Sequence, residues 1–399
     1  MLIAGEPSGD LLAAELVGSL RERVVQRGGV PPQFFGAGGP RMGEAGVELQ
    51  LDLTQYAIIG LADVLRNLWR LRRILEQMLD LACARRPEVI VCVDYGGFNR
   101  RFAAALRARQ TAGWRPHLVQ YVSPQVWASR PGRARTLARD LDLLVSILPI
   151  EPAWYARRHP RLRVEFVGHP IVDRHPAAAK AIEPPEGCPR RVVLLPGSRP
   201  SEIARHWPLM LEAARRVAAG KGPAVEWVAV FPDDSLRQAA LAADKGTDLA
   251  LECRVGGLSE ELARATLSIA STGTVTLECA LWRVPTLAIY QASWSTYQIA
   301  RRIIRVRHLA LPNLLAPAPV MPEFLQTQAT PETIAAEAGR LLCDADARRA
   351  MRERLGDVVA QLGPPGAVGR AAEAILGLLP ADPRGPAAGR DRPPELRTG

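Results

Sequence analysis

The chain has few of the features that mark secreted, disulfide-bonded or membrane-spanning proteins. Its six cysteines are scattered along the 399 residues without any Cys-x-x-Cys spacing, so we expect reduced thiols in a cytoplasmic protein. The six histidines are dispersed as well, and we expect neither a metal nor another cofactor. Apolar runs such as residues 143–150 cover less than half of a membrane span. The first residues have neither the basic start nor the apolar core of a secretory signal peptide.

Lysine is also scarce, since only three of the 51 basic residues are lysines, and the formal net charge is +10. A basic surface attracts anionic membranes, nucleic acids and phosphorylated substrates. Aromatic residues make up only 5% of the chain, and no RRM, KH or helix-turn-helix signature is present. Nucleic acid is therefore the least favoured partner. The charge favours a phosphorylated substrate and an anionic membrane surface.

Short apolar runs alternate with helical patterns along the whole chain, which is typical of βα units and parallel sheets. Helical patterns include residues 11–25 and 61–81. The sequence thus predicts an α/β protein with two Rossmann-like domains, each built on a parallel sheet. The expected strands are 2–4, 33–35, 89–93, 118–121, 143–148 and 164–167 in the first half, and 192–195, 225–230, 267–270 and 286–289 in the second.

The domain boundary is expected at residues 174–190, which hold four prolines and little hydrophobicity and read as a linker. This leaves a first domain at 1–173 and a second at 191–345. C-terminal helices follow at 346–379, with 367–379 the candidate for a helix that crosses back to the first domain. The last residues, 380–399, are rich in Pro, Gly, Arg and Asp and are expected to be disordered.

Residues 191–206 carry the most informative local pattern, in which an apolar strand ends at Pro-Gly-Ser and a helical pattern follows. Such a turn presents backbone N–H groups at the positive end of a helix dipole, which is a ready anion site. We place Gly197 and Ser198 in the turn. Arg199 can bind a phosphate in bidentate fashion, and Glu202 lies in the first helical turn. The alternative is an ordinary βα turn with a surface arginine.

The same pattern recurs after the strand 267–270, where Ser271, Gly273 and Thr274 form the turn and Glu278 lies on the helix that follows. A carboxylate one helical turn after Thr274 can accept both hydroxyls of a ribose; a plain surface glutamate is the alternative. Gly257, which follows another strand, either approaches the base of the nucleotide through its backbone or forms an ordinary turn. Two anion turns and a helix-borne carboxylate predict a nucleotide-sugar site.

The first half of the chain carries two acids at strand ends. Asp94 directly follows the buried strand 89–93 and points into the expected cleft from a rigid base, unless it caps the next helix. Glu6 follows the first strand. We expect it to contact the acceptor, meaning the molecule that would receive the sugar from the nucleotide, or to act as a second catalytic carboxylate. Ser8 or Asp10 then either contributes to the site or caps the first helix.

Seven motifs follow one another along the chain: Ala4 to Asp10, Gly38 to Met42, Tyr121 to Ala128, Phe166 to Pro170, Leu194 to Arg199, Ala270 to Glu278, and Leu311 to Ala316. Together they make the chain resemble the lipid-A-disaccharide synthases from about residue 3 to 378. This resemblance implies the GT-B fold, in which two Rossmann-like domains face each other across a cleft. It also implies that Asn313 and Gln326 complete the donor-sugar site.

The reaction implied by the resemblance is inverting transfer of 2,3-diacylglucosamine from UDP-2,3-diacylglucosamine to 2,3-diacylglucosamine 1-phosphate, with UDP as the leaving group. Such an in-line displacement needs a base and a group that stabilises the leaving UDP. We assign Asp94 as the base for the acceptor's 6-hydroxyl and Arg199 to the leaving diphosphate. The family often has a second acid within residues 94–99, but this chain reads Asp-Tyr-Gly-Gly-Phe-Asn there. It also has an extra residue, Thr272, in the second turn.

Acylated substrates require a lipid-facing surface, and residues 58–81 offer one. An apolar face that includes Leu65, Leu68 and Trp69 lies beside arginines such as Arg72, as in interfacial helices. A core-packed amphipathic helix is the alternative. Four arginines within residues 294–307 add electrostatic attraction. We expect a cytoplasmic protein attached peripherally to the inner membrane, and homo-oligomerisation stays open.

Two other functions remain open at this stage. A UDP-sugar 2-epimerase of the same architecture would share the nucleotide site, but it would need further acids and a histidine and would not need the arginine-rimmed apolar helix. A non-catalytic nucleotide-sugar-binding protein would keep the turns without Asp94 and Glu6. The sugar nucleotide alone separates the three functions, because an epimerase converts it, a transferase requires the acceptor and a binding protein does neither.

Overall fold

The computed structural model describes residues 1–56, 61–111, 113–180, 189–243 and 249–380. These residues form two compact units. The first unit comprises residues 1–125 and 132–170 together with the chain from Gly366 on, and the second comprises 126–131 and 171–365. Residues 171–180, part of which we expected in a linker, belong to the second unit as a short helix, α8 Ile171–Arg174, and a 3-10 helix, η3 Pro176–Lys180.

The first unit is built on a seven-stranded parallel sheet in the order β3-β2-β1-β4-β5-β6-β7. Its strands are β1 Leu2–Ala4, β2 Phe35–Gly38, β3 Glu48–Asp52, β4 Val89–Val93, β5 His117–Tyr121, β6 Leu143–Ser146 and β7 Val164–Phe166. Its helices are α1 Pro7–Gln26, α2 Pro40–Glu44, α3 Leu61–Arg85, α4 Gly96–Arg109, α6 Ala134–Asp140, α7 Glu151–Ala156 and α17 Ala367–Leu376, with 3-10 turns η1 Thr54–Tyr56 and η2 Pro131–Arg133.

The second unit is built on a six-stranded parallel sheet in the order β10-β9-β8-β11-β12-β13. Its strands are β8 Arg190–Leu195, β9 Val225–Phe231, β10 Leu251–Val255, β11 Leu267–Ser271, β12 Thr286–Tyr290 and β13 Glu323–Leu325. Its helices are α5 Val126–Ser129, α8 Ile171–Arg174, α9 Pro200–Ala218, α10 Asp234–Ala243, α11 Leu258–Arg264, α12 Thr274–Leu281, α13 Trp294–Ile303, α14 Leu311–Leu315, α15 Pro331–Cys343 and α16 Ala345–Gln361, with 3-10 turns η3 Pro176–Lys180 and η4 Gln326–Gln328.

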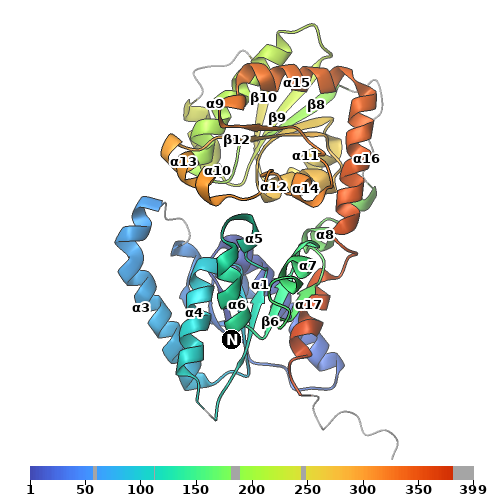
Figure 1. Ribbon diagram of the computed structural model, residues 1–399. Coiled ribbons are helices and arrows are strands. Elements are labelled where there is room, and N and C mark those ends of the chain that lie inside the picture. The colour runs from blue at the N-terminus through green and yellow to red at the C-terminus, as the bar shows by residue number, and fades with distance from the viewer. Residues whose placement is uncertain (57–60, 112, 181–188, 244–248, 381–399) are drawn as a thin grey trace, which may run out of the picture. The chain divides into compact units, whose positions relative to one another are not determined.

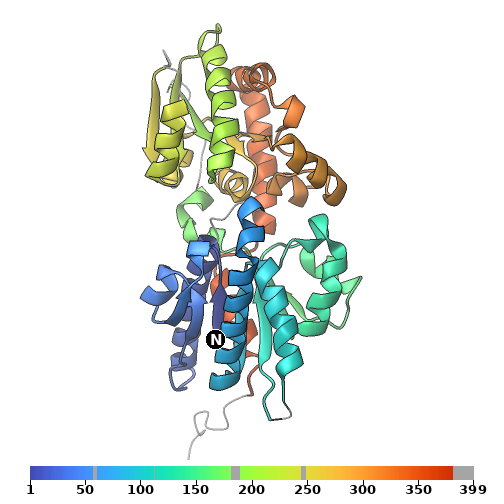
Figure 2. The ribbon, with the colours of Figure 1, turned by 90° about the vertical axis from the view of Figure 1, so that its left-hand side faces the viewer.

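These sheets confirm the predicted fold class of two parallel-sheet, Rossmann-like domains (Figures 1 and 2). The central strands are buried along almost their whole length, and strands covered on both faces read as unbroken apolar runs, which is why the sequence reveals them. The strand expected at 33–35 lies instead at Phe35–Gly38. A side chain at Gly36 would place its Cβ 1.9 Å from the Leu2 carbonyl oxygen, so the close approach of β1 selects glycine over ordinary strand residues there.

Each sheet reverses its strand order at one point, between β1 and β4 in the first unit and between β8 and β11 in the second. Strands on the two sides of such a point send their helices to opposite faces of the sheet, which leaves a crevice beyond the carboxyl ends where ligands bind. The four segments that follow these strands begin at Gly5, Asp94, Pro196 and Thr272. The topology therefore brings the predicted site segments together in pairs within each unit.

The last helix, α17, packs against α1 in the first unit. Glu373 forms ion pairs with Arg23 and Arg27 of α1, and the Arg370 Nε donates a hydrogen bond to the Val167 carbonyl at 2.8 Å. Buried residues of α17, such as Ile375, join the apolar core of the unit. Among the described residues, none of the helices is both long and apolar enough to cross a membrane.

Candidate active site

Asp94 lies at the carboxyl end of β4 in a backbone conformation that non-glycine residues seldom adopt. Its φ is 48° and that of Tyr95 is 44°, both in the left-handed region. Two amide side chains hold the Asp94 carbonyl, because Asn99 Nδ2 and Gln120 Nε2 each donate a hydrogen bond to it at 2.9 Å. Backbone strain of this kind persists only where surrounding contacts enforce it, and it clusters at functional sites.

The Asp94 carboxylate is half-buried, and burial raises the pKa of Asp94 above its ordinary value. Hydrogen bonds from the Tyr95 backbone N–H and from Ser8 Oγ, the latter at 3.5 Å, partly offset this rise. A carboxylate with a raised pKa is a stronger base than an exposed one. The alternative that Asp94 caps the next helix is wrong, because Tyr95 occupies the N-cap position of α4 and no side chain caps it.

The ring of Tyr95, the residue after Asp94, connects Asp94 to the segment that holds Glu6. The Tyr95 ring packs on Gly5, where an added Cβ would come within 2.2 Å of Cδ1. Burial raises the pKa of Tyr95, and the negative charge of Glu6 raises it further. Glu6 occupies the N-cap position of α1, but its side chain makes no capping hydrogen bond. Both acids therefore belong to one cluster at the β1–β4 reversal point.

Asp10 does not cap the first helix, and neither does Ser8, because Glu6 is the N-cap residue of α1 and no side chain caps that helix. The Asp10 side chain is buried and accepts hydrogen bonds from the backbone N–H groups of Gly39, Arg41 and Met42 at 2.8, 3.0 and 3.1 Å. It thus ties α1 to the start of α2. The first and second motifs of the sequence are joined by this acid.

In the turn after β8, the Glu202 side chain binds the groups that we expected to bind phosphate. Glu202 Oε2 accepts the backbone N–H of Ser198 at 2.9 Å, and Glu202 Oε1 lies 3.2 Å from Arg199 Nη1. Gly197 has a φ of 128°, and an added Cβ there would lie 2.5 Å from Glu202 Oε2. The Arg199 side chain is 71% exposed, so its ion pair is weak. The predicted phosphate ligands of this turn are held by a carboxylate of the chain itself.

The turn after β11 is open. Gly273 has a φ of 139° and no atom within 4 Å of the position that a Cβ would take. Helix α12 begins at Thr274, so its first N–H groups have no partner within the helix. Ser271 Oγ is buried and has no hydrogen-bond partner among the described residues. This turn therefore has free N–H groups and open space, as an anion site requires. The turn after β8 offers the same only if Glu202 moves away.

Glu278 lies one turn into α12 and is half-buried. Burial raises the pKa of Glu278 to about 7, and the positive charge of Arg174 opposes the rise. Within the described part of the chain its carboxylate accepts no hydrogen bond, so both oxygens are available. A carboxylate in this state can accept two neighbouring hydroxyl groups when it is ionised.

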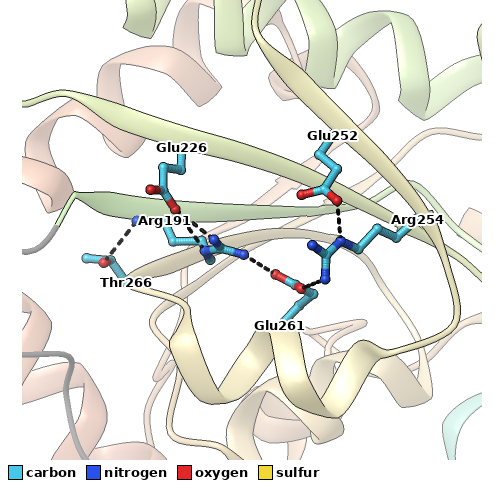
Figure 3. A network of polar contacts seen from close by, with 6 residues as sticks. All are labelled: Arg191, Glu226, Glu252, Arg254, Glu261 and Thr266. Carbon is cyan, nitrogen blue, oxygen red and sulfur yellow. Dashed lines mark hydrogen bonds and ion pairs between the residues drawn. The ribbon is translucent and has the colours of Figure 1, made fainter.

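Gly257 follows β10 with a φ of 71° and is the N-cap residue of α11. A buried acid in the middle of this helix, Glu261, anchors it to the sheet (Figure 3). Its two oxygens pair with Arg191 Nη1 at 2.6 Å and with Arg254 Nη1 at 2.5 Å. These arginines come from β8 and β10, so the network ties α11 to β10 and to the amino end of β8.

Asn313 and Gln326 hold backbone segments rather than presenting free amides. Asn313 Nδ2 donates to the Met321 carbonyl and to Glu323, while its Oδ1 accepts the N–H groups of Val320 and Met321. All four of its hydrogen-bonding positions are used. The Gln326 side chain pairs in both directions with the Ala292 backbone. Both amides thus hold backbone segments in place, Asn313 the segment at residues 320–321 and Gln326 the segment at Ala292.

His206 lies against the turn after β8, and the sequence did not reveal this contact. Its Nδ1 lies 3.0 Å from the Pro196 carbonyl oxygen, and its Nε2 accepts the Gln291 N–H at 3.0 Å. Burial lowers the pKa of His206, which keeps the ring neutral with the proton on Nδ1. The histidine therefore links the turn after β8 to the loop after β12. Its spacing from Ile203 and Met210 on α9 signals only a buried helix face.

The predicted lipid-facing helix has two different parts. In the carboxyl-terminal half of α3, Ile74, Met78 and Leu79 are buried in the first unit. Trp69 is 81% exposed, and Arg72 is exposed as well. The side chains of Leu65 and Leu68 lie outside the described residues. The core-packed alternative thus holds for the second half of α3, whereas Trp69 lies on the surface.

Comparison with known proteins identifies the family. The model of the lipid-A-disaccharide synthetase family matches residues 1–371. A lipid-A-disaccharide synthase from Anaeromyxobacter dehalogenans is 40% identical over 385 residues, which cover 95% of this chain and 97% of the relative. The Myxococcus xanthus protein of the same name is 35% identical with the same coverage. This chain belongs to the lipid-A-disaccharide synthetase family. The predicted resemblance is confirmed, and the chain is assigned as a glycosyltransferase of lipid A biosynthesis.

Solved structures agree with the family at the level of the fold. A putative UDP-N-acetylglucosamine 2-epimerase from Listeria monocytogenes aligns with a TM-score of 0.58 at 14% identity and covers 94% of this chain and 95% of its own. The kitacinnamycin glycosyltransferase aligns with a TM-score of 0.58 at 16% identity, with 95% and 98% covered. This chain thus shares its two-domain fold with both of these proteins. In the described residues no three His, Cys, Asp or Glu side chains gather as a metal site.

Proposed function

We propose that this enzyme transfers 2,3-diacylglucosamine from UDP-2,3-diacylglucosamine to the 6-hydroxyl of 2,3-diacylglucosamine 1-phosphate with inversion at the anomeric carbon. The products are a β-1,6-linked disaccharide 1-phosphate and UDP. The observation that carries the proposal is the placement of Asp94, a half-buried acid with a raised pKa at the reversal point of the first sheet. Membership of the family supplies the substrate class.

In the proposed mechanism, Asp94 removes the proton of the acceptor hydroxyl as its oxygen attacks the anomeric carbon from the face opposite UDP. Glu6 binds the acceptor or takes the proton from Asp94. Arg199 and the N–H groups at the start of α12 stabilise the negative charge that develops on the departing diphosphate. Ser271, Gly273 and Thr274 hold that diphosphate, and Glu278 binds the ribose.

The same proposal places Gly257 beside the uracil and leaves Asn313 and Gln326 with the positioning roles described above. We further propose that the enzyme attaches peripherally to the cytoplasmic face of the inner membrane, because both sugars carry acyl chains. Exposed Trp69 and Arg72 on α3 support this attachment, since aromatic and basic side chains favour an anionic interface.

The test is UDP release from UDP-2,3-diacylglucosamine, measured with and without 2,3-diacylglucosamine 1-phosphate. Acceptor-dependent release by the wild type, reduced about 10²- to 10⁴-fold in Asp94→Asn, supports the reaction and the base. Release retained in Asp94→Asn moves the base to Glu6. Conversion of UDP-N-acetylglucosamine to its 2-epimer without acceptor shows an epimerase, and no turnover of either substrate shows a binding protein.

A further inference from the structure

The second unit contains a pocket of about 210 Å³ whose lining includes Gln326 but otherwise none of the residues of the proposed nucleotide site. It lies between the end of β12, helix α13 and the end of β13, and Tyr290, Tyr297, Ile304, Leu309 and Leu325 line it. Residues 297, 300, 301 and 304 repeat at the spacing of a single helix face, so one side of α13 forms a wall. The lining is mainly apolar, which suits hydrocarbon better than a sugar.

Positive charge and exposed apolar side chains surround this pocket. Arg301 and Arg307 line it and are exposed, and neither makes an ion pair among the described residues. Trp294 at the start of α13 is 77% exposed, and Ile304 is 36% exposed. An apolar pocket with unpaired arginines at its edge fits an amphiphile that carries negative charge near an acyl chain.

One imidazole separates the pocket from the turn after β8. His206 contacts the Pro196 carbonyl on one side and the Gln291 N–H on the other, each at 3.0 Å. The ring of Tyr290, a lining residue, lies 6.0 Å from that of His206 between centroids. When a diphosphate binds the turn after β8, the sugar bonded to that diphosphate therefore lies within reach of the pocket.

The strand order also decides which end of a sugar nucleotide meets the pocket. Gly257, the proposed uracil contact, follows β10 at one edge of the sheet, whereas the diphosphate turns follow the central strands β8 and β11. The pocket lies on the other side, at β12 and β13. Since neighbouring strands are about 4.8 Å apart, β12 lies roughly 10 Å from β8. A ligand that runs from uracil through diphosphate reaches the pocket with its acylated sugar.

We infer that this pocket binds an acyl chain of the donor, an inference that rests on the proposed function. Pockets that hold a complete drug-sized ligand measure about 300–1,000 Å³, so a pocket of about 210 Å³ takes a single chain segment and not the whole glycolipid. Arg301 and Arg307 add positive charge at the edge of this pocket. The pocket thereby makes the donor's chain length a determinant of its affinity.

The test compares two UDP-2,3-diacylglucosamine donors, one with long acyl chains and one with four-carbon chains, both dispersed in detergent. Ala300→Phe fills the pocket from the wall that α13 provides. Ala239→Phe, at an exposed position on α10, is the matched control. Ile304→Asp places a charge in the same wall at a partly exposed position. It replaces Ala300→Phe in the test if that variant strongly lowers the melting temperature.

We expect Ala300→Phe and Ile304→Asp to raise the KM of the long-chain donor about tenfold or more, since each lost methylene contact weakens binding several-fold. The KM of the short-chain donor and inhibition by UDP should match the wild type and Ala239→Phe. Equal changes for both donors, or none for the long-chain donor, overturn the inference alone. Reduced retention on phospholipid vesicles with an unchanged KM assigns the pocket to a bilayer lipid instead and also overturns it. A wild type without acceptor-dependent UDP release overturns the proposed function and the inference together.

Discussion

The backbone N–H of Ser198 donates a hydrogen bond to Glu202 Oε2 at 2.9 Å, although this N–H is the group that the sequence assigns to a diphosphate. The same carboxylate reaches Arg199 with its other oxygen. A diphosphate that binds this turn has to displace Glu202, because two anions cannot share the same donors in close contact. The carboxylate therefore holds the turn in shape while competing with the donor.

Replacing Glu202 by glutamine should strengthen nucleotide binding. The amide oxygen can keep the Ser198 N–H, but it no longer repels phosphate or pairs with Arg199 as an ion. We expect the inhibition constant of UDP to fall about two- to tenfold, as for the loss of one screened surface charge interaction. Competitive inhibition by UDP measures this, and Glu212→Gln, on the exposed part of α9, is the control. A higher inhibition constant would show that Glu202 contributes more by shaping the turn than it costs by repulsion.

Asp94→Asn should stabilise the protein while it lowers turnover. Because the folded-state pKa of Asp94 is raised, the folded state binds more protons than the unfolded state, and stability falls as pH rises from the ordinary value through the raised one. Asparagine does not ionise, so it avoids this loss of stability at higher pH. It is also tolerated in the left-handed conformation that residue 94 adopts. We expect a higher melting temperature at pH 7.5 and a smaller gain at pH 4. A variant that is less stable at both pH values contradicts this account of the carboxylate.

The pH dependence of donor binding should follow Glu278. With a pKa of about 7, its carboxylate is largely protonated at pH 6 and ionised at pH 8, and only the ionised form accepts both ribose hydroxyls. We expect the donor KM to be several-fold higher at pH 6 than at pH 8, and Glu278→Gln to raise the KM at pH 8 about tenfold. The donor is a better probe than UDP, whose terminal phosphate titrates in this range. A wild-type pH dependence that survives in Glu278→Gln would assign it to another group.

Asp10 should matter for stability and not for chemistry. Its side chain is 2% exposed and satisfies three backbone N–H groups. Alanine leaves these donors without partners, so we expect a loss of about 3 kcal/mol of unfolding free energy. Asparagine can keep the bonds at one oxygen and should lose about half as much. Urea unfolding measures both variants, and a kcat of Asp10→Asn far below the wild type would mean that this acid takes part in catalysis.

The central strands and the turns after them were predictable from the sequence because they are buried on both faces. The strands at 2–4 and 89–93 match the structure residue for residue. Three edge strands, β3, β10 and β13, are absent from the expected ranges, and β10 was implied only as the strand that Gly257 follows. Glu48–Asp52 alternates polar and apolar residues on an exposed edge, and Glu323–Leu325 is only three residues long. An edge strand needs neither a continuous apolar run nor much length, so its sequence resembles a loop.

The partners of the polar side chains were far less predictable. Gln326 pairs with a backbone 34 residues away, and Asp10 reaches residues 29 to 32 positions along the chain. His206 connects two loops 95 residues apart, at Pro196 and Gln291. Spacing along the chain reports which face of an element is buried, but such contacts depend on the order of strands in the sheet. The sequence therefore located the strand ends that carry the site and misjudged which polar groups are already in use.

Trp69 should contribute to membrane attachment without contributing to catalysis. Its side chain is 81% exposed on α3, where an indole gains free energy by entering an interface. We expect Trp69→Ser to lower retention on vesicles that contain anionic lipid about tenfold, as for removal of one large apolar group from an interface, while kcat with detergent-dispersed substrates stays unchanged. Val30→Ser, which alters another exposed apolar residue (87% exposed) of the same unit, controls for a general loss of surface hydrophobicity. Equal retention of the two variants would leave α3 as a surface helix without a role at the membrane.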